Sequence, residues 1–177
     1  QARGPVYNTY GPTEFTVDAT YFELRKGESY DPIPIGRPLY NCYAFVCDTN
    51  CRLLPRGMAG ELCLTGPQIA EGYRNRPDLT EKAFVDCPWL PGKKMYRTGD
   101  LARWNPEGQL EYLGRIDNQV KLRGFRIELG EIENRASQYE GIMAVSAQVR
   151  RDTLVLYYTS DGEIDPDALK AFLAETL

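Results

Sequence analysis

Two short stretches of the chain carry side chains suited to binding a nucleotide and its metal. In Asn8–Glu14, reading NTYGPTE, a glycine-proline turn follows a strand-like run and presents consecutive backbone groups and short side chains. Tyr10 offers a flat face on which a purine can stack, Thr13 offers a hydroxyl to a phosphate, and Glu14 offers a hard oxygen ligand to Mg²⁺. Taken alone, the segment is as typical of an ordinary turn as of a binding site.

The second stretch is Tyr96–Leu101, reading YRTGDL. Its Asp100 follows a glycine, and a carboxylate in that position can accept hydrogen bonds from two vicinal hydroxyls, as nucleotide-binding folds do with ribose. A bare threonine-glycine-aspartate is otherwise typical of a β-turn.

A third stretch divides the chain. Gly114–Glu133, reading GRIDNQVKLRGFRIELGEIE, carries three glycines and mixes charges of both signs, unlike an ordinary core strand or surface helix. The composition changes at Asp117, and rearrangements between domains are commonly absorbed by a few residues at the ends of elements. We predict two domains, 1–116 and 117–177, joined at Asp117.

The elements expected in these domains define an α+β fold. The first domain has many short strands separated by turn signals, which predicts a small antiparallel barrel-like sheet, and one short helix at Leu79–Val85 with Asp78 as its cap. The second is predicted as a small, truncated α+β domain whose last helix has Asp165 as its cap and Pro166 at its first position. The other predicted elements are strands at Val17–Leu24, Cys42–Cys47, Arg52–Leu54, Glu61–Thr65, Met95–Arg97, Leu101–Trp104, Gln109–Leu113, Gln119–Leu122, Phe125–Ile127, Ile142–Val149 and Thr153–Thr159, and helices at Leu129–Tyr139 and Asp167–Leu173.

Composition narrows the class of protein. The 177 residues carry a net charge of −4, which argues against a general nucleic-acid binder, and no apolar run approaches the roughly 20 residues of a membrane span. The chain contains no histidine, so Ser-His-Asp and Cys-His catalysis cannot arise within it. The odd number of cysteines, five, favours reduced thiols and a cytoplasmic location. Cys42, Cys47 and Cys51 are close enough in sequence to suggest a metal site, but without a C-x-x-C pair they are more simply interpreted as small strand residues.

Together with Gly60–Tyr73, reading GELCLTGPQIAEGY, the three stretches resemble four motifs of the adenylate-forming (AMP-binding) enzymes, in that family's order. The closer resemblance is to the amino-acid adenylation domains of nonribosomal peptide synthetases, from Asn8 to about Tyr139. It implies that ATP and an amino acid form aminoacyl-AMP, and that the acyl group then moves to the phosphopantetheine arm of a carrier protein. ATP and Mg²⁺ are the implied cofactors. The implied partners are the amino-acid substrate, a peptidyl carrier protein and neighbouring synthetase domains, with no nucleic acid and no membrane.

The resemblance also implies roles for individual residues. Tyr10 would pack on adenine, Thr13 would meet the α-phosphate and Glu14 would hold the magnesium ion. Asp100 would bind the ribose, with Arg115 near the ribose and phosphates. The whole nucleotide-binding set is Asn8, Tyr10, Gly11, Thr13, Glu14, Asp100 and Arg115. Gly60–Tyr73 would support the pocket, and no catalytic residue is assigned in it.

In the second domain, the resemblance makes Asp117 the hinge between an adenylation pose and a thiolation pose. Lys121 resembles a lysine that acts in the thiolation pose. Gly124 resembles the glycine at the tunnel that admits the phosphopantetheine arm, where any side chain would obstruct a thin ligand.

By the same resemblance, Thr9, Val17 and Asp18 line the amino-acid pocket. Because a buried carboxylate needs a partner, Asp18 either favours a basic or hydroxylated amino acid or is salt-bridged to the protein itself. The family's phosphate loop would lie before Gln1 and its late catalytic lysine beyond Leu177, so we expect residues 1–177 alone to be an inactive fragment.

Two alternatives stay open. An acyl- or aryl-CoA ligase belongs to the same superfamily, but such enzymes usually have proline-alanine where this chain has Leu129-Gly130, within RIELGEIE. The other alternative is a non-catalytic adenylation-like module that only binds a carrier partner.

Overall fold

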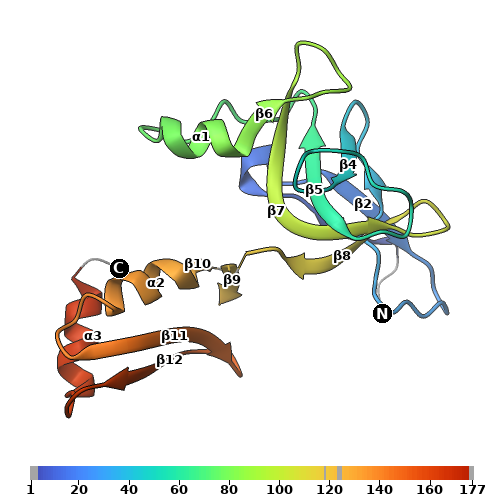
Figure 1. Cartoon of the computed structure of the whole chain (residues 1–177). Helices are drawn as coiled ribbons and strands as arrows, with labels where there is room; N and C mark the ends of the chain where they lie inside the picture. Colours follow the sequence, from blue (N-terminus) through green and yellow to red (C-terminus); the bar gives the residue numbers. More distant parts are fainter. Residues whose placement is uncertain (1–3, 118, 123–124, 176–177) are drawn as a thin grey trace. The chain divides into compact units, whose positions relative to one another are not determined.

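The structure is a computed structural model that describes residues 4–117, 119–122 and 125–175, with the side chains of Lys121 and Arg126 left undescribed. The chain forms two compact units, 1–116 and 117–177 (Figure 1). Both mix strands and helices, so the fold is α+β.

The first unit holds two sheets. The smaller has the order β1-β2-β3 and is antiparallel, with strands at Val6–Tyr10, Thr20–Leu24 and Arg37–Pro38. A 3-10 turn, η1 (Thr13–Phe15), lies between β1 and β2. This arrangement places NTYGPTE at the end of a sheet strand, where the chain turns back on itself.

The larger sheet is built around β7 (Lys94–Trp104), which bends strongly along its length (Figure 1). One edge of β7 pairs with β5 (Gly60–Thr65), which pairs in turn with β4 (Tyr43–Cys47). The other edge pairs with β6 (Phe84–Asp86) near its start and with β8 (Leu110–Arg115) near its end. The predicted strands Met95–Arg97 and Leu101–Trp104 are thus parts of one strand.

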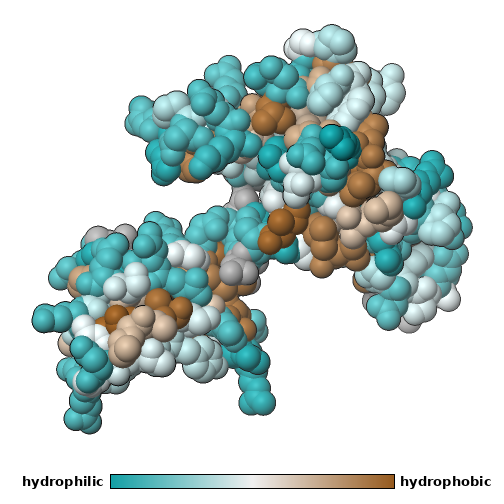
Figure 2. All heavy atoms as spheres, in the orientation of Figure 1, coloured by the Kyte–Doolittle hydropathy of each residue, from teal (hydrophilic) through white to brown (hydrophobic). Residues whose placement is uncertain are grey.

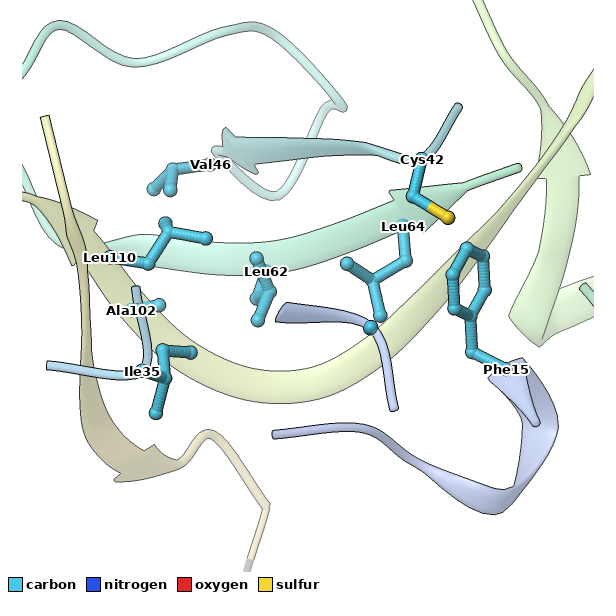
Figure 3. Close-up of a cluster of buried hydrophobic side chains, with 9 residues drawn as sticks. Phe15, Ile35, Cys42, Val46, Leu62, Leu64, Ala102 and Leu110 are labelled. Atoms are coloured by element: carbon cyan, nitrogen blue, oxygen red, sulfur yellow. The ribbon is translucent and has the colours of Figure 1, made fainter. Parts of the chain in front are cut away.

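Central position explains why β5 is buried on both faces. Leu62 and Leu64 point into a core between the sheets, shown in Figure 3, whereas Cys63 joins a second cluster on the opposite face. The first cluster consists of Phe15, Ala19, Ile35, Cys42, Val46, Leu62, Leu64, Ala102 and Leu110. Phe15 belongs to η1, so the segment that carries the candidate site is anchored in this core.

The cysteines behave as small apolar residues. Cys42 lies in the cluster between the sheets, and Cys47, Cys63 and Cys87 lie in the cluster on the other face of β5. Within the described residues, no group of three or more cysteine, aspartate or glutamate side chains is arranged to hold a metal ion.

Two local predictions for the first unit are wrong. The helix α1 spans Pro77–Ala83, and Asp78 lies inside it rather than at the cap, where Arg76 stands. The Asp78 carboxylate instead accepts hydrogen bonds from Arg76, at 2.8 and 3.0 Å. The strand predicted at Arg52–Leu54 is reduced to a single bridge between Cys47 and Leu53.

Among its described residues, the second unit contains two antiparallel strand pairs and two helices. β9 (Gln119–Leu122) pairs with β10 (Phe125–Glu128), and β11 (Ile142–Arg150) pairs with β12 (Thr153–Ser160). Leu129 and Ile132 of α2 (Leu129–Ala136) pack against Ala147 of β11. α3 (Pro166–Ala174) is capped by Asp165, whose carboxylate accepts from the Asp167 amide, as predicted.

Hydrophilic residues cover much of the face shown in Figure 2, with smaller apolar groups between them. Within the described part of the chain, none of the helices combines the length and apolar character that a membrane crossing requires.

Candidate nucleotide site

The buried carboxylate of Asp100 is the centre of a polar cluster in the first unit. Its Oδ2 accepts a hydrogen bond from the Tyr10 hydroxyl, and its Oδ1 accepts one from Arg115 Nη1 at 3.0 Å. Asp100 and Arg115 are directly paired in the register of β7 and β8, while Tyr10 ends β1. The structure therefore brings together three residues that the sequence places far apart.

Burial and, after it, the Asp100 carboxylate raise the pKa of the Tyr10 phenol well above its ordinary value. Tyr10 consequently remains a hydrogen-bond donor at all physiological pH values. The pairing with Arg115 keeps a cation beside the carboxylate, so the cluster combines both charges with an aromatic ring.

Tyr112 adds a second aromatic ring that the sequence analysis missed. It lies on β8, its ring centroid is 6.1 Å from that of Tyr10, and the two planes differ by 34°. Its side chain is 38% exposed. Aromatic faces beside a carboxylate that can accept from hydroxyls suit a nucleoside, because the base is flat and the ribose has two vicinal hydroxyls. Tyr112 lies two residues before the stretch Gly114–Glu133, and only the tertiary structure reveals that its ring lies beside that of Tyr10.

Glu14 forms a second polar centre in η1. Its carboxylate is buried, and its Oε1 accepts a hydrogen bond from the Tyr73 hydroxyl at 2.7 Å. A Mg²⁺ ion bound to a nucleotide takes one or two protein carboxylates and completes its shell with phosphates and water. Carboxylate ligands are themselves oriented by hydrogen bonds from neighbouring groups, as Tyr73 orients Glu14. The residues present thus fit a nucleotide-bound magnesium ion. Tyr73, in the segment 60–73 to which no site residue was assigned, is a further residue that sequence reasoning missed.

The loop after η1 has an unusual backbone. Thr16 and Val17 both have positive φ, 53° and 72°, and the Val17 side chain is 72% exposed. Gln68 holds the loop from outside: its carbonyl accepts from the Thr16 hydroxyl at 2.8 Å and its side-chain amide donates to the Asp18 carbonyl. Gln68 therefore holds the loop that contains the predicted pocket residues Val17 and Asp18.

The other residues predicted for the site are distributed over both units. Asn8 donates from its side chain to the Pro34 carbonyl at 2.7 Å, and Thr9 is exposed on β1 opposite Tyr21. Thr13 is exposed at the start of η1. In the second unit, the Asp117 carboxylate accepts from the Gln119 amide at 3.1 Å. The backbone of Lys121 lies in β9, but its side chain and the whole of Gly124 fall outside the described residues.

The first unit thus places two aromatic rings beside the Asp100 carboxylate and holds the Glu14 carboxylate in η1. Residues 1–74 match the family model described as AMP-binding enzyme. Tyrocidine synthase 2 of Brevibacillus parabrevis is 46% identical over 175 residues, and bacitracin synthase 1 of Bacillus licheniformis is 46% identical over 181 residues. These matches cover 96% and 99% of this chain but only 5% and 3% of the two synthases.

Solved structures agree with these sequence matches. PA1221, described as a nonribosomal peptide synthetase protein containing adenylation and carrier-protein (PCP) domains, is 33% identical with a TM-score of 0.80. The adenylation domain AlmE of Vibrio cholerae, solved with glycyl-adenosine-5'-phosphate, is 31% identical with a TM-score of 0.82. The matches cover 94% and 98% of this chain, which spans about a third of each solved chain (35% and 34%). The chain belongs to the AMP-binding enzymes and resembles the adenylation domains of nonribosomal peptide synthetases.

Proposed function

We propose that the protein containing this chain activates an amino acid with ATP and then passes it to the phosphopantetheine thiol of a carrier protein. The observation that carries the proposal is the cluster of Tyr10, Asp100 and Arg115, which unites an aromatic face, a hydroxyl acceptor and a cation. The similarity to a synthetase protein with adenylation and PCP domains supports a carrier protein as the partner. Neighbouring synthetase domains would be further partners.

In the first half-reaction, a carboxylate oxygen of the amino acid attacks the α-phosphorus of ATP. The new oxygen–phosphorus bond forms as the bond to the β-phosphate breaks, so the products are aminoacyl-AMP and pyrophosphate. The protein's part is to align these atoms and to stabilise negative charge on the phosphates. Mg²⁺, when bound, would supply further positive charge to the phosphate oxygens.

Within this scheme each site residue has a role. Tyr10 and Tyr112 would hold the adenine, and Asp100 would accept from the ribose hydroxyls when they replace the Tyr10 hydroxyl. Arg115 would keep a positive charge near the ribose and phosphates, Thr13 would donate to the α-phosphate, and Glu14 would bind the metal. The other proposed contacts are those of Asn8 and Gly11 with the nucleotide and of Thr9, Val17 and Asp18 with the amino acid.

The second unit would serve the second half-reaction. In it the carrier thiol attacks the acyl carbon of aminoacyl-AMP, the thioester bond forms, and AMP leaves. Asp117 would be the hinge that permits a change of pose, Lys121 would act in the thiolation pose, and Gly124 would leave room for the phosphopantetheine arm. The first unit would then be the end of a larger core that includes a barrel-like subdomain.

We also propose that residues 1–177 do not catalyse the reaction by themselves. The chain spans about a third of the two solved chains described above, so the rest of an adenylation domain would have to complete the active site. The experiments below therefore use a complete adenylation domain that carries these residues.

An acyl- or aryl-CoA ligase is the second candidate function. The sequence RIELGEIE disfavours it, because Leu129 and Gly130 open α2 where such ligases usually have proline-alanine. Leu129 is also 6% exposed and packs in the core of the second unit.

The test is amino-acid-dependent exchange of pyrophosphate into ATP, with a panel of all common amino acids and ornithine. We expect exchange with one or a few of them, among which a basic or hydroxylated amino acid would agree with Asp18. A folded domain that binds ATP but exchanges with no amino acid would refute the proposal and favour another carboxylic acid or a non-catalytic module. Asp100→Ala should strongly raise the Michaelis constant for ATP, and unchanged kinetics would refute its role.

A further inference from the structure

β7 contains a bulge at the residues that carry Asp100. Arg97 pairs with Cys63 and Leu101 pairs with Glu61, so Thr98, Gly99 and Asp100 together lie opposite the single residue Leu62. Gly99 has a φ of +69°, in the left-handed region that favours glycine. Bulges re-aim side chains beside active sites, but the extra residues lose regular ladder partners along the bulged edge, here the edge that faces β5, and need others there.

Glu61 of β5 supplies one such partner from its buried carboxylate. Its Oε1 accepts from the Gly99 amide at 3.1 Å, inside the bulge. Its Oε2 accepts from Arg97 Nε and Nη2 at 2.9 and 2.6 Å, at the last regular residue before the bulge. The carboxylate therefore ties the middle of the bulge, and the residue just before it, to the neighbouring strand.

The bulge in turn determines the position of the nucleotide-site residues. The Thr98 hydroxyl donates to the Leu62 carbonyl at 2.7 Å and accepts from the Asp100 amide at 3.0 Å. Arg115 Nη1 donates to the Thr98 carbonyl at 2.8 Å as well as to Asp100. A displacement of the bulge would thus move both the Asp100 carboxylate and the Arg115 guanidinium.

We infer that Glu61 is a positioning residue for the nucleotide site, which holds the bulge so that Asp100 faces the ribose. The inference rests on the proposed function, because it takes Asp100 as the group that binds the ribose hydroxyls. An ion pair that is largely buried adds little net stability, since the loss of solvation offsets the attraction. Stabilising the sheet is therefore a weak reason for Glu61 to be a glutamate, whereas fixing the bulge explains both of its contacts.

The chain offers a matched control in Glu111 on β8. It is also buried and also accepts from an arginine of β7, with Arg103 Nε at 2.7 Å from its Oε2. Its other hydrogen bond comes from Asn105, so its partners lie at the end of β7 away from the bulge. Glu61→Gln and Glu111→Gln are therefore equal chemical changes at two ion pairs of one strand.

The experiment measures kcat/KM for ATP and for 2'-deoxy-ATP in pyrophosphate exchange, using the complete domain as wild type, Glu61→Gln, Glu111→Gln and Asp100→Ala. The ratio of kcat/KM for ATP to kcat/KM for 2'-deoxy-ATP measures how strongly the site recognises the 2'-hydroxyl of the ribose. We expect Glu61→Gln to lower this ratio by about tenfold, the size expected for weakening a hydrogen bond to a charged group. The Michaelis constant for the amino acid should change little, and Glu111→Gln should keep the wild-type ratio.

Glu61→Asp provides a second variant in case Glu61→Gln does not fold. It keeps the charge beside Arg97 but is one methylene shorter, so it cannot reach Arg97 and Gly99 together, and its ratio should also fall. If the ratio falls in Asp100→Ala, a folded Glu61 variant that keeps the wild-type ratio would overturn the inference. If Asp100→Ala itself keeps the ratio, the proposed ribose contact is wrong and the inference falls with it. Equal losses in the Glu61 and Glu111 variants would indicate a general effect on the sheet and would also overturn it.

Discussion

Gly11 offers a sharp test of how closely the loop of the candidate site is packed. A Cβ added at Gly11 would lie 2.2 Å from the Val17 carbonyl oxygen and 2.7 Å from the Asp18 Cα. Both atoms belong to the backbone, so no side-chain rotation relieves the contact. The loop is also tied beside Gly11, because the Ala19 amide donates to the Tyr10 carbonyl at 2.7 Å.

The size of the effect follows from these distances. Cβ atoms essentially never come closer than 3.0 Å to such neighbours, so Gly11→Ala has to displace Val17 by about 0.8 Å. Overpacking of this kind costs about 1–3 kcal/mol of folding free energy. A misplacement of about 1 Å in a binding site can lower activity by about 100-fold. We therefore expect kcat/KM for the amino acid to fall by roughly that factor while the domain remains folded.

Two measurements are made: pyrophosphate exchange at varied amino-acid concentration, and thermal unfolding monitored by circular dichroism. Gly4→Ala is the control, because an added Cβ there meets nothing within 4 Å. It should leave both measurements at wild-type values. A Gly11→Ala variant with wild-type exchange and stability would refute the close packing of residues 11, 17 and 18.

Further predictions concern the second unit and α1. Asp117→Pro should restrict the backbone at the proposed hinge and slow thioester formation more than adenylation. The control Asp117→Ala should not slow thioester formation selectively. Wild-type rates of both half-reactions in the proline variant would show that Asp117 is not the hinge. Gly130→Ala should raise the free energy of unfolding by about 0.5–1 kcal/mol, because Gly130 lies in α2 and an added Cβ meets nothing within 4 Å. An unchanged or lower melting temperature would contradict this prediction. The hydrogen bonds from Arg76 lower the pKa of Asp78 to about 2, so their stabilising contribution should be present above the ordinary pKa of 3.8 and be lost as the pH falls from 3.8 towards 2. An NMR titration should show this low pKa and its return towards 3.8 in Arg76→Ala, and a pKa that stays low in the variant would disprove the cause.

Local signals explain which parts of the fold were predictable. The cap at Asp165, the hairpin of β9 and β10 and the two strands β11 and β12 depend on residues close in sequence, and the structure contains all of them. The family was likewise readable from four motifs, because its characteristic residues stand in short runs in a fixed order.

The sequence by itself thus determined the class of fold, the family and a list of residues suited to a nucleotide. Only the tertiary structure decided how these residues are held. The bulge in β7, the contact of Glu61 with Gly99, the bond from Tyr73 to Glu14 and the pairing of Tyr112 with Tyr10 all join segments that are distant in sequence. The physical reason is that such contacts depend on strand register and on how the sheets and loops pack against one another, and no local pattern sets either.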